Sequence, residues 1–143
     1  ERLDLYRAWH HARETARDWP SSSLDAEAYH YQFSYPHPAG RELTFHDGER
    51  LVAVGIVDVT PKALSAVYFF YHPEIANLSP GVANVLYCLE AARARGIPHV
   101  YLGYRVMGCA SMRYKAGFRP HEVLEGRPGF DEEPRWVEPA YLL

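Results

Sequence analysis

The chain has 143 residues, a formal net charge of −3, and a composition that is 48% hydrophobic and 14% aromatic. This apolar content is enough for a core, and we expect one domain over residues 1–143. The sequence shows neither a run of eighteen apolar residues nor a secretion signal, which predicts a soluble, cytoplasmic protein rather than a membrane protein. Cys88 and Cys109 do not form a clustered metal motif; we expect reduced thiols, with a single disulfide as the alternative.

The first third of the chain favours two helices. Residues 3–19 carry apolar side chains at spacings of four and three, which is typical of one helical stripe, and Pro20 ends it. The predicted stripe contains Leu5, Trp9, Ala12, Ala16 and Trp19. Serines precede a second, short helix within residues 21–33, and this helix is expected to turn Leu24, Ala28 and Tyr31 inward.

The middle of the chain favours strands. Residues 42–60 predict a hairpin with Asp47-Gly48 as the turn and a long β-rich second arm, because Asp-Gly is a strong hairpin signal. Pro61 and Lys62 form the next turn. Residues 64–73 are apolar on both faces, which is typical of a strand in the middle of a sheet.

The last part of the chain alternates helix and strand. The main helix is expected over residues 82–96, with Val82, Val85, Leu86, Leu89 and Ala92 on its buried stripe and Gly96 at its end. A strand over 99–106, a short helix over 109–118 and a last strand within 135–142 follow. This order predicts an α/β (α+β) fold, a mixed sheet with helices packed on it, and is similar to the plan of the GCN5-related N-acyltransferases.

The positive charges are unevenly distributed. Residues 91–121 contain no Asp or Glu, although the whole chain is acidic. A local positive field of this kind indicates an anionic ligand or substrate, whereas a solvated helix face is the alternative for Arg93 and Arg95. The cations of this stretch are Arg93, Arg95, Arg105, Arg113, Lys115 and Arg119.

Several chemistries are disfavoured. The eight histidines form no metal-binding pattern, and neither cysteine lies in a context that activates a thiolate. Enzymes of the GCN5-like plan that use acetyl-CoA hold its pyrophosphate with the backbone amides of a Gly-rich turn before the main helix. Here the turn reads "ANLSPGVAN" over residues 76–84, with one glycine, one proline and no cation. We therefore expect an acyl donor other than coenzyme A.

Two stretches carry a family resemblance. The first is "DVTPKALSAVYFFYHPEIANLSPGVANVL", which includes Tyr71 and Pro73. The second is "YLGYRVMGCASMRYKAGFRPHEVL". Together they resemble the C-terminal catalytic domain of the arginyl/leucyl aminoacyl-tRNA protein transferases, the N-degron enzymes, over roughly residues 47 to 124. The specific pattern consists of Cys109, Met112, Tyr114, Lys115, Phe118, Arg119 and Pro120. The family usually has aspartate where His72 stands, and its cysteine-containing N-terminal domain is absent from these residues.

The resemblance implies transfer of arginine or leucine from charged tRNA to the α-amine of a protein that begins with Asp or Glu. The aminoacyl ester is already activated and the amine has an ordinary pKa of about 7.7 to 8.0, so positioning is the main requirement. Aminoacyl-tRNA is the co-substrate, and we expect no cofactor and no metal.

The candidate catalytic residues are Tyr71, which could hydrogen-bond the reacting ester, and Asp58, which could orient the amine. The alternatives are a half-buried tyrosine at a strand end and an aspartate that ends its strand and caps the Thr60-Pro61 turn. Cations with interleaved aromatic rings suit an acidic residue and a tRNA end. The candidate substrate and tRNA contacts are Tyr104, Arg113, Tyr114, Lys115 and Arg119.

Each of these contacts has a structural alternative. Tyr114 and Phe118 lie four apart and fit a core as well as a site. Arg119, before Pro120, could serve as a structural fork on backbone carbonyls. Two further functions stay open for the whole chain: an acyl-CoA-dependent N-acyltransferase, and a non-catalytic module of the same fold that binds acidic peptides.

Overall fold

A computed structural model of the chain describes residues 1–18, 20–21 and 24–139. These residues divide into two compact units, Glu1–Gly103 and Tyr104–Leu143. The single domain expected from the sequence stays a prediction, because the division does not decide how the units associate. Among the described residues no helix is long and apolar enough to cross a bilayer, and no cluster of three or more possible metal ligands occurs.

The first unit is built on a four-stranded sheet of order β1-β2-β3-β4. Strands β1 (Gly40–Asp47), β2 (Arg50–Val59) and β3 (Ala63–Tyr71) are antiparallel neighbours, and β4 (His99–Tyr101) runs parallel to β3. The β1-β2 hairpin confirms the turn signal: Asp47 pairs with Arg50, and Gly48 has the positive φ of 58° that this tight turn needs. The central position of β3 is also confirmed.

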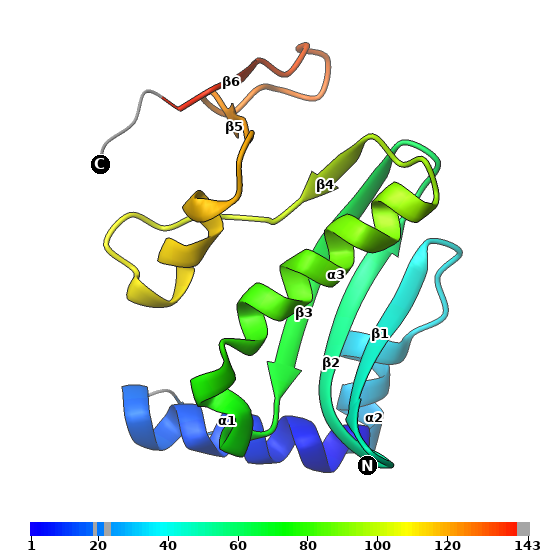
Figure 1. Cartoon of the computed structure of the whole chain (residues 1–143), viewed down its shortest axis with the longest axis vertical. Coiled ribbons are helices and arrows are strands. Elements are labelled where there is room, and N and C mark those ends of the chain that lie inside the picture. The colour runs from blue at the N-terminus through cyan, green and yellow to red at the C-terminus, as the bar shows by residue number, and fades with distance from the viewer. Residues whose placement is uncertain (19, 22–23, 140–143) are drawn as a thin grey trace. The chain divides into compact units, whose positions relative to one another are not determined.

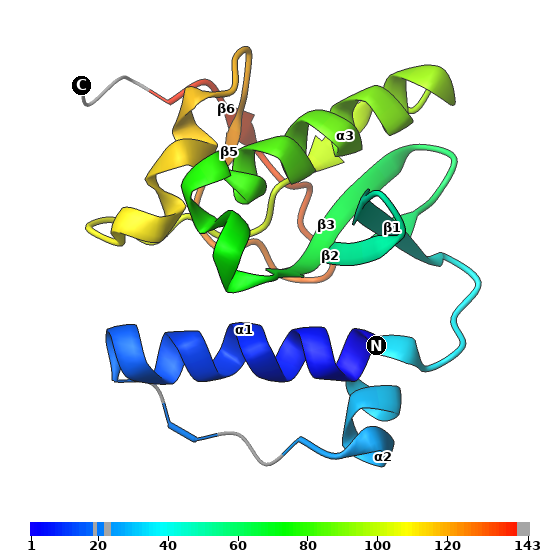
Figure 2. The same ribbon diagram turned by 60° about the horizontal axis from the view of Figure 1, so that its bottom comes forward.

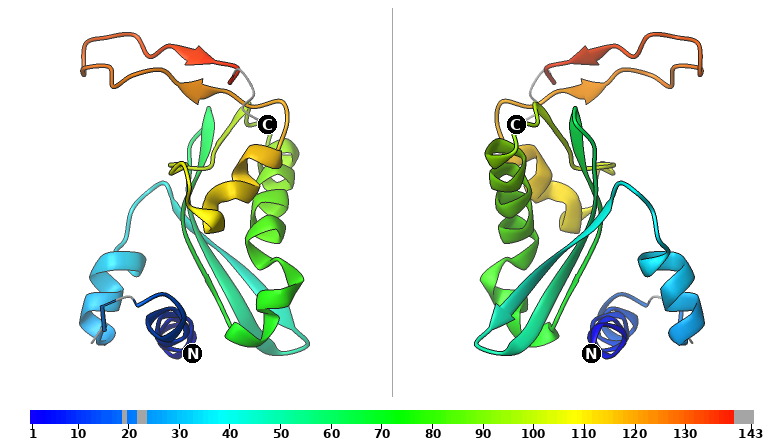
Figure 3. Two further views of the ribbon diagram at one scale, coloured as in Figure 1. Left: turned by 90° about the vertical axis from the view of Figure 1, so that its left-hand side faces the viewer. Right: turned by 90° about the vertical axis from the view of Figure 1, so that its right-hand side faces the viewer.

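Helices cover both faces of this sheet. Helix α3 (Pro80–Ala94) lies on one face, and α1 (Arg2–Arg17) with α2 (Ala26–Tyr29) lies on the other (Figures 1, 2 and 3). A core around Phe70 and Val54 fills the α1 face, whereas Val57, Leu64 and Cys88 form the core beneath α3. The mixed sheet between helices confirms the predicted fold class.

Two predicted helix faces are corrected. On α1, Leu5 and Trp9 are buried as expected, joined by Tyr6, whereas Ala16, also expected inside, is exposed. Trp19 lies outside the described residues. The second helix continues as a π-helical segment, η1 (His30–Ser34), which adds a residue to each turn. Tyr29 is buried at the end of α2, whereas Ala28 and Tyr31, both expected inside, are exposed, Tyr31 at 62%.

The buried stripe of α3 is rotated relative to the prediction. Asn84, Val85, Cys88 and Ala92 are buried, whereas Leu86 and Leu89 are exposed. Asn84 faces β2 at Gly55, where a Cβ atom would stand 2.5 Å from the Asn84 Oδ1 atom. A glycine on β2 thus admits the helix side chain, and the contact face of α3 shifts toward Asn84.

The second unit has little regular structure. Its short helix is the 3-10 segment η3 (Ala110–Gly117), and a two-stranded ladder joins β5 (Val123–Leu124) to β6 (Trp136–Val137). The last strand was expected within 135–142, and β6 confirms its first part; residues 140–142 lie outside the described residues. The predicted strand over 99–106 is shorter, since β4 ends at Tyr101.

Candidate active site

The end of β3 carries a tyrosine that is held by the first helix. Arg13 Nη2 donates a hydrogen bond of 2.8 Å to the Tyr71 hydroxyl oxygen. The same guanidinium lies 5.4 Å from the centre of the Trp9 ring and 5.9 Å from that of Tyr71. Trp9 and Arg13 share one face of α1 because they are four residues apart. The hydroxyl accepts from Arg13, so its own proton is left for a donor role.

A second pair on α1 lies within one turn of Arg13. His10 Nδ1 is 2.9 Å from a Glu14 carboxylate oxygen, and the two side chains are only 13% and 19% exposed. The exposed His11 contacts the other Glu14 oxygen at 3.3 Å. A carboxylate at one ring nitrogen orients an imidazole for proton exchange or for hydrogen bonding at the other.

Asp58 lies far from Tyr71 within the same sheet. Tyr71 pairs with Ala53, whereas Asp58 stands five residues further along β2, opposite Ser65. At about 3.3 Å per residue this separation is about 17 Å along the strand. The Thr60 hydroxyl closes the nearby turn, because it donates to the Ala63 carbonyl oxygen and accepts the Ala63 backbone N–H. Thr60 therefore caps this turn, in place of Asp58, for which capping was the alternative role.

His72 follows Tyr71 and begins the 3-10 segment η2 (Pro73–Leu78). Its Nδ1 atom accepts the Glu74 backbone N–H at 3.4 Å, as an aspartate oxygen does at a helix start. The imidazole can thus provide the capping contact that an aspartate would provide at this position.

The turn before α3 is poorly suited to a phosphate. Ser79 is in the left-handed region at φ 55°, and its carbonyl accepts the N–H groups of Val82 and Ala83 at 2.9 and 3.2 Å. Pro80 has no N–H at all. Three of the first amides are therefore not available to an anion, as the sequence suggested.

The second unit holds the basic and aromatic candidates. Lys115 Nζ donates to the Tyr104 carbonyl oxygen at 2.9 Å, and burial lowers the pKa of the Lys115 ammonium. The Tyr104 side chain itself is 89% exposed. Tyr114 and Phe118 meet edge to face at 6.5 Å, consistent with the predicted packing pair. Arg113 and Arg119 are both exposed.

The structure thus joins some of the predicted residues and not others. Within the second unit Lys115 lies against the backbone of Tyr104, and within the first unit Tyr71 and Asp58 lie apart. Sequence reasoning missed Arg13 as the partner of Tyr71 and the His10–Glu14 pair. The spacing of four between His10 and Glu14 was a readable signal, since such pairs face each other on a helix; nothing in the sequence linked Arg13 to a residue 58 positions away.

Comparison with solved structures identifies the class of fold. The ribosomal-protein-S18-alanine N-acetyltransferase from Escherichia coli matches over 94% of this chain and 84% of its own, with a TM-score of 0.55 and 17% identity. A possible acetyltransferase from Clostridium difficile 630 covers 92% and 91%, with a TM-score of 0.59 and 11% identity. The first unit therefore belongs to a GCN5-related N-acetyltransferase fold.

Sequence comparison identifies the family within that class. Residues 1–125 match the family described as arginine-tRNA-protein transferase, C terminus, and the chain belongs to it. An aspartate/glutamate leucyltransferase of Campylobacter jejuni is 32% identical over 139 residues, which are 95% of this chain and 58% of that protein. The protein of the same name from Halorhodospira halophila is 51% identical over 77 residues, 54% of this chain and 33% of its own. The matched residues span 58% of the C. jejuni protein and 33% of the H. halophila protein.

Proposed function

We propose that this chain carries out aminoacyl transfer from charged tRNA to the α-amine of a protein that begins with aspartate or glutamate. The observation that carries the proposal is the family match over residues 1–125, which includes both Tyr71 and the basic segment. The relatives are named leucyltransferases, which favours leucine over arginine as the transferred amino acid. A reaction that consumes charged tRNA also supports the expected cytoplasmic location.

The reaction exchanges one acyl bond for another. The neutral α-amine attacks the ester carbonyl carbon, the new C–N bond forms, and the ester C–O bond to the tRNA ribose breaks. The amine gives up one proton and the leaving ribose oxygen takes one, so no oxidant and no enzyme nucleophile are required. The protein must orient the two substrates and stabilise the developing negative charge on oxygen.

Tyr71 is the residue we assign to the reacting ester. Arg13 fixes the hydroxyl oxygen at 2.8 Å, so the phenolic proton can be donated to the carbonyl or the leaving oxygen. Asp58 lies about 17 Å along β2 from Ala53, the partner of Tyr71, so it does not contact the same reacting atoms as Tyr71. Its role in orienting the amine stays a prediction.

The second unit supplies the proposed tRNA contacts. Exposed Arg113 and Arg119 offer donors to phosphates, and the exposed Tyr104 ring offers a stacking surface for an unpaired base. Lys115 holds the Tyr104 backbone, so it supports this surface as well as adding charge. The stretch 91–121 contains no Asp or Glu, which supports a positive field around these groups.

A transfer assay tests the proposal. The purified chain is mixed with tRNA charged with labelled leucine or arginine and with peptides that begin with Asp, Glu or Ala. We expect label on the Asp and Glu peptides and none on the Ala peptide. Transfer of acetyl from acetyl-CoA instead, or peptide binding without turnover, would replace the proposal by one of the two alternative functions.

A further inference from the structure

Strand β3 has a partner strand on both sides only at its start. Its pairing with β2 extends from Leu64 to Tyr71, whereas its pairing with β4 covers residues 63–65. Figure 1 shows the short β4 arrow beside one end of β3. Among the described residues, no strand pairs with residues 66–71 on this side, and we call this stretch the open edge of β3. Unpaired backbone groups on such an edge can bond another extended chain.

The hydrogen bonds between β2 and β3 show which backbone groups face the open edge. His72 N donates to the Val52 carbonyl oxygen at 2.7 Å, one position beyond the Ala53–Tyr71 pair. Along a strand, the N–H and C=O groups of successive residues alternate between its two sides. Tyr71 and, two residues earlier, Phe69 therefore direct both groups away from β2. These two residues offer two donors and two acceptors to the open edge, about 7 Å apart along the strand.

The open edge leads to the hydroxyl that we assign to the reacting ester. The rings of Phe69 and Tyr71 have 5.7 Å between their centroids, and Arg13 holds the Tyr71 hydroxyl. Val67, the extra residue of a β-bulge on β3, is 52% exposed. Bulges are frequent next to active sites, and residues 63–71 include no charged side chain. An extended chain on this edge therefore meets apolar side chains and ends beside Tyr71.

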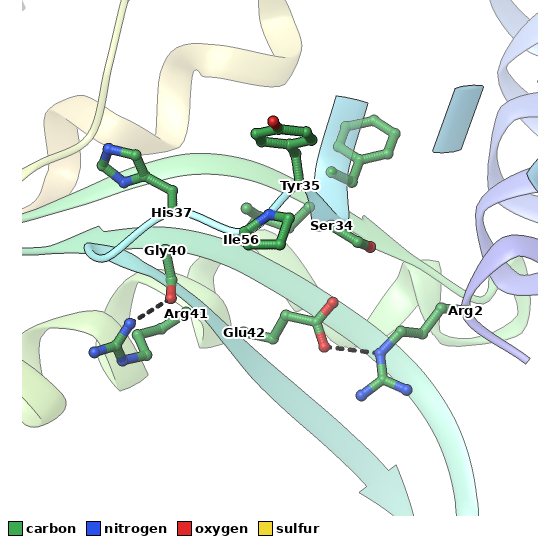
Figure 4. Close-up of a pocket in the computed structure, with 10 residues that line it drawn as sticks. Arg2, Ser34, Tyr35, His37, Gly40, Arg41, Glu42 and Ile56 are labelled. Atoms are coloured by element: carbon green, nitrogen blue, oxygen red, sulfur yellow. Dashed lines mark hydrogen bonds and ion pairs between the residues drawn. The ribbon is translucent and has the colours of Figure 1, made fainter. Parts of the chain in front are cut away.

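The opposite edge of the same sheet is protected. Strand β1 carries Arg41, Glu42 and Asp47, and its register shifts near its end. Arg41 Nη1 donates to the Gly40 carbonyl oxygen at 2.6 Å, and Figure 4 shows its guanidinium turned back toward this atom. Charged side chains on an edge strand are a common means of preventing further pairing. The contrast with the uncharged β3 indicates that its open edge is kept available for a ligand.

We propose that the acceptor protein binds to the open edge of β3 as an added strand, with its first residues bonded to the backbone of Phe69 and Tyr71. Its α-amine lies at the Tyr71 end, so the acceptor runs antiparallel to β3 and its later residues extend toward Ser65. This mode of binding rests on the proposed transfer reaction, whose acceptor it holds.

Backbone pairing suits an acceptor that is defined by its first residue alone. Proteins that begin with aspartate or glutamate differ in the residues that follow, and main-chain hydrogen bonds do not depend on those side chains. An RNA strand has no alternating N–H and C=O groups, so the tRNA end is a poor occupant of this edge. The pantetheine arm of coenzyme A has two amide groups and is the rival small ligand.

The test measures peptide binding in the absence of tRNA. A fluorescent peptide that begins with Asp is titrated with the full chain, and the N–H groups of its second to fifth residues are replaced by N-methyl groups one at a time. In an added strand only alternate residues direct their N–H to β3, and each methyl group there removes a hydrogen bond and adds a clash. We expect about ten-fold weaker binding for every second peptide and less than about two-fold change for those between. Equal effects at all positions, or no binding of the parent peptide, would overturn the proposal.

Amide hydrogen exchange locates the peptide on the protein. The amides of Phe69 and Tyr71 should exchange about ten-fold more slowly with the peptide bound. Thr44 is the matched control: Val59 N donates to the Ala39 carbonyl oxygen, so alternation directs the Thr44 N–H to the outer side of β1, and its exchange should not change. Protection of Phe69 and Tyr71 by coenzyme A instead of the peptide, or by higher protein concentration alone, would assign the edge to an acyl donor or to a second copy and overturn the proposal.

Transfer and pairing can fail separately. Transfer to the Asp peptide without the alternating effect of N-methylation would leave the proposed reaction standing and overturn the added strand. The alternating effect without transfer would support the added strand and contradict only the reaction.

Discussion

Replacing Tyr71 with phenylalanine isolates the hydroxyl that Arg13 holds. The ring remains, so the contact of the guanidinium with the aromatic faces of residue 71 and Trp9 is retained. Only the 2.8 Å hydrogen bond is lost. A hydrogen bond to a charged group contributes about 1.5–3 kcal/mol, and partial exposure reduces this to about 1–2 kcal/mol here. For a chain of this size, each kcal/mol corresponds to about 3 °C in Tm.

The assay is urea and thermal unfolding of a double-mutant cycle. Tyr71→Phe, Arg13→Met and the double variant are compared with the parent, and we expect a coupling energy of about 1 kcal/mol. Tyr87→Phe is the matched control, because this exposed hydroxyl has no partner among the described residues and its loss should cost less than about 0.5 kcal/mol.

Activity separates positioning from stability in the same variant. Under conditions where Tyr71→Phe is fully folded, we expect transfer to fall about 100-fold, as is common when a donor to a developing oxyanion is removed. Strict additivity of the two substitutions would refute the inferred contact. Full transfer by Tyr71→Phe would refute the assignment of its hydroxyl to the ester.

Three further predictions concern packing, pH and the basic segment. Gly55→Ala should lower the free energy of urea unfolding by about 1–3 kcal/mol, because its Cβ would stand 2.5 Å from Asn84 Oδ1. Adding Asn84→Ala in the same chain should recover part of this loss. Parental stability of Gly55→Ala would contradict the close approach. Burial raises the pKa of Cys88 to about 11 from 9.0, so the folded state keeps a proton that the unfolded state releases. About 3 kcal/mol of stability should be present below pH 9 and lost toward pH 11, and Cys88→Ala should flatten this loss if the thiol causes it. Lys115→Ala and Arg119→Glu should each abolish transfer while the circular dichroism spectrum stays unchanged, and normal transfer by both would make the segment structural.

The local signals in the sequence predicted the elements well but not their contact faces. Asp47-Gly48 marks the hairpin because only a few residue pairs adopt its backbone, and this signal is independent of distant neighbours. The face of α3 is different: periodicity predicts an apolar stripe, yet Leu86 is exposed and Asn84 is buried. The space left by Gly55, on another element, decides which edge of the stripe contacts the sheet.

The candidate site is similar: local sequence patterns indicate some of its residues but not the contacts that they make. Tyr71 could be selected from its position at the end of a central strand, and the basic segment from its charge. The Arg13 contact depends on how α1 crosses the sheet, which no local pattern reports. Tyr29 rather than Tyr31 is buried, and the π-helical segment that follows Tyr29 has no simple sequence period.

In the proposed reaction this chain moves an amino acid from tRNA to an acidic N-terminus. The most direct test uses the purified chain, tRNA charged with labelled leucine, and two peptides that differ only in beginning with Asp or Ala. We expect label on the Asp peptide, linked through its α-amine, and none on the Ala peptide. Equal labelling of both peptides would contradict the acceptor assignment, and no labelling by the folded chain would contradict the proposed transfer by these residues.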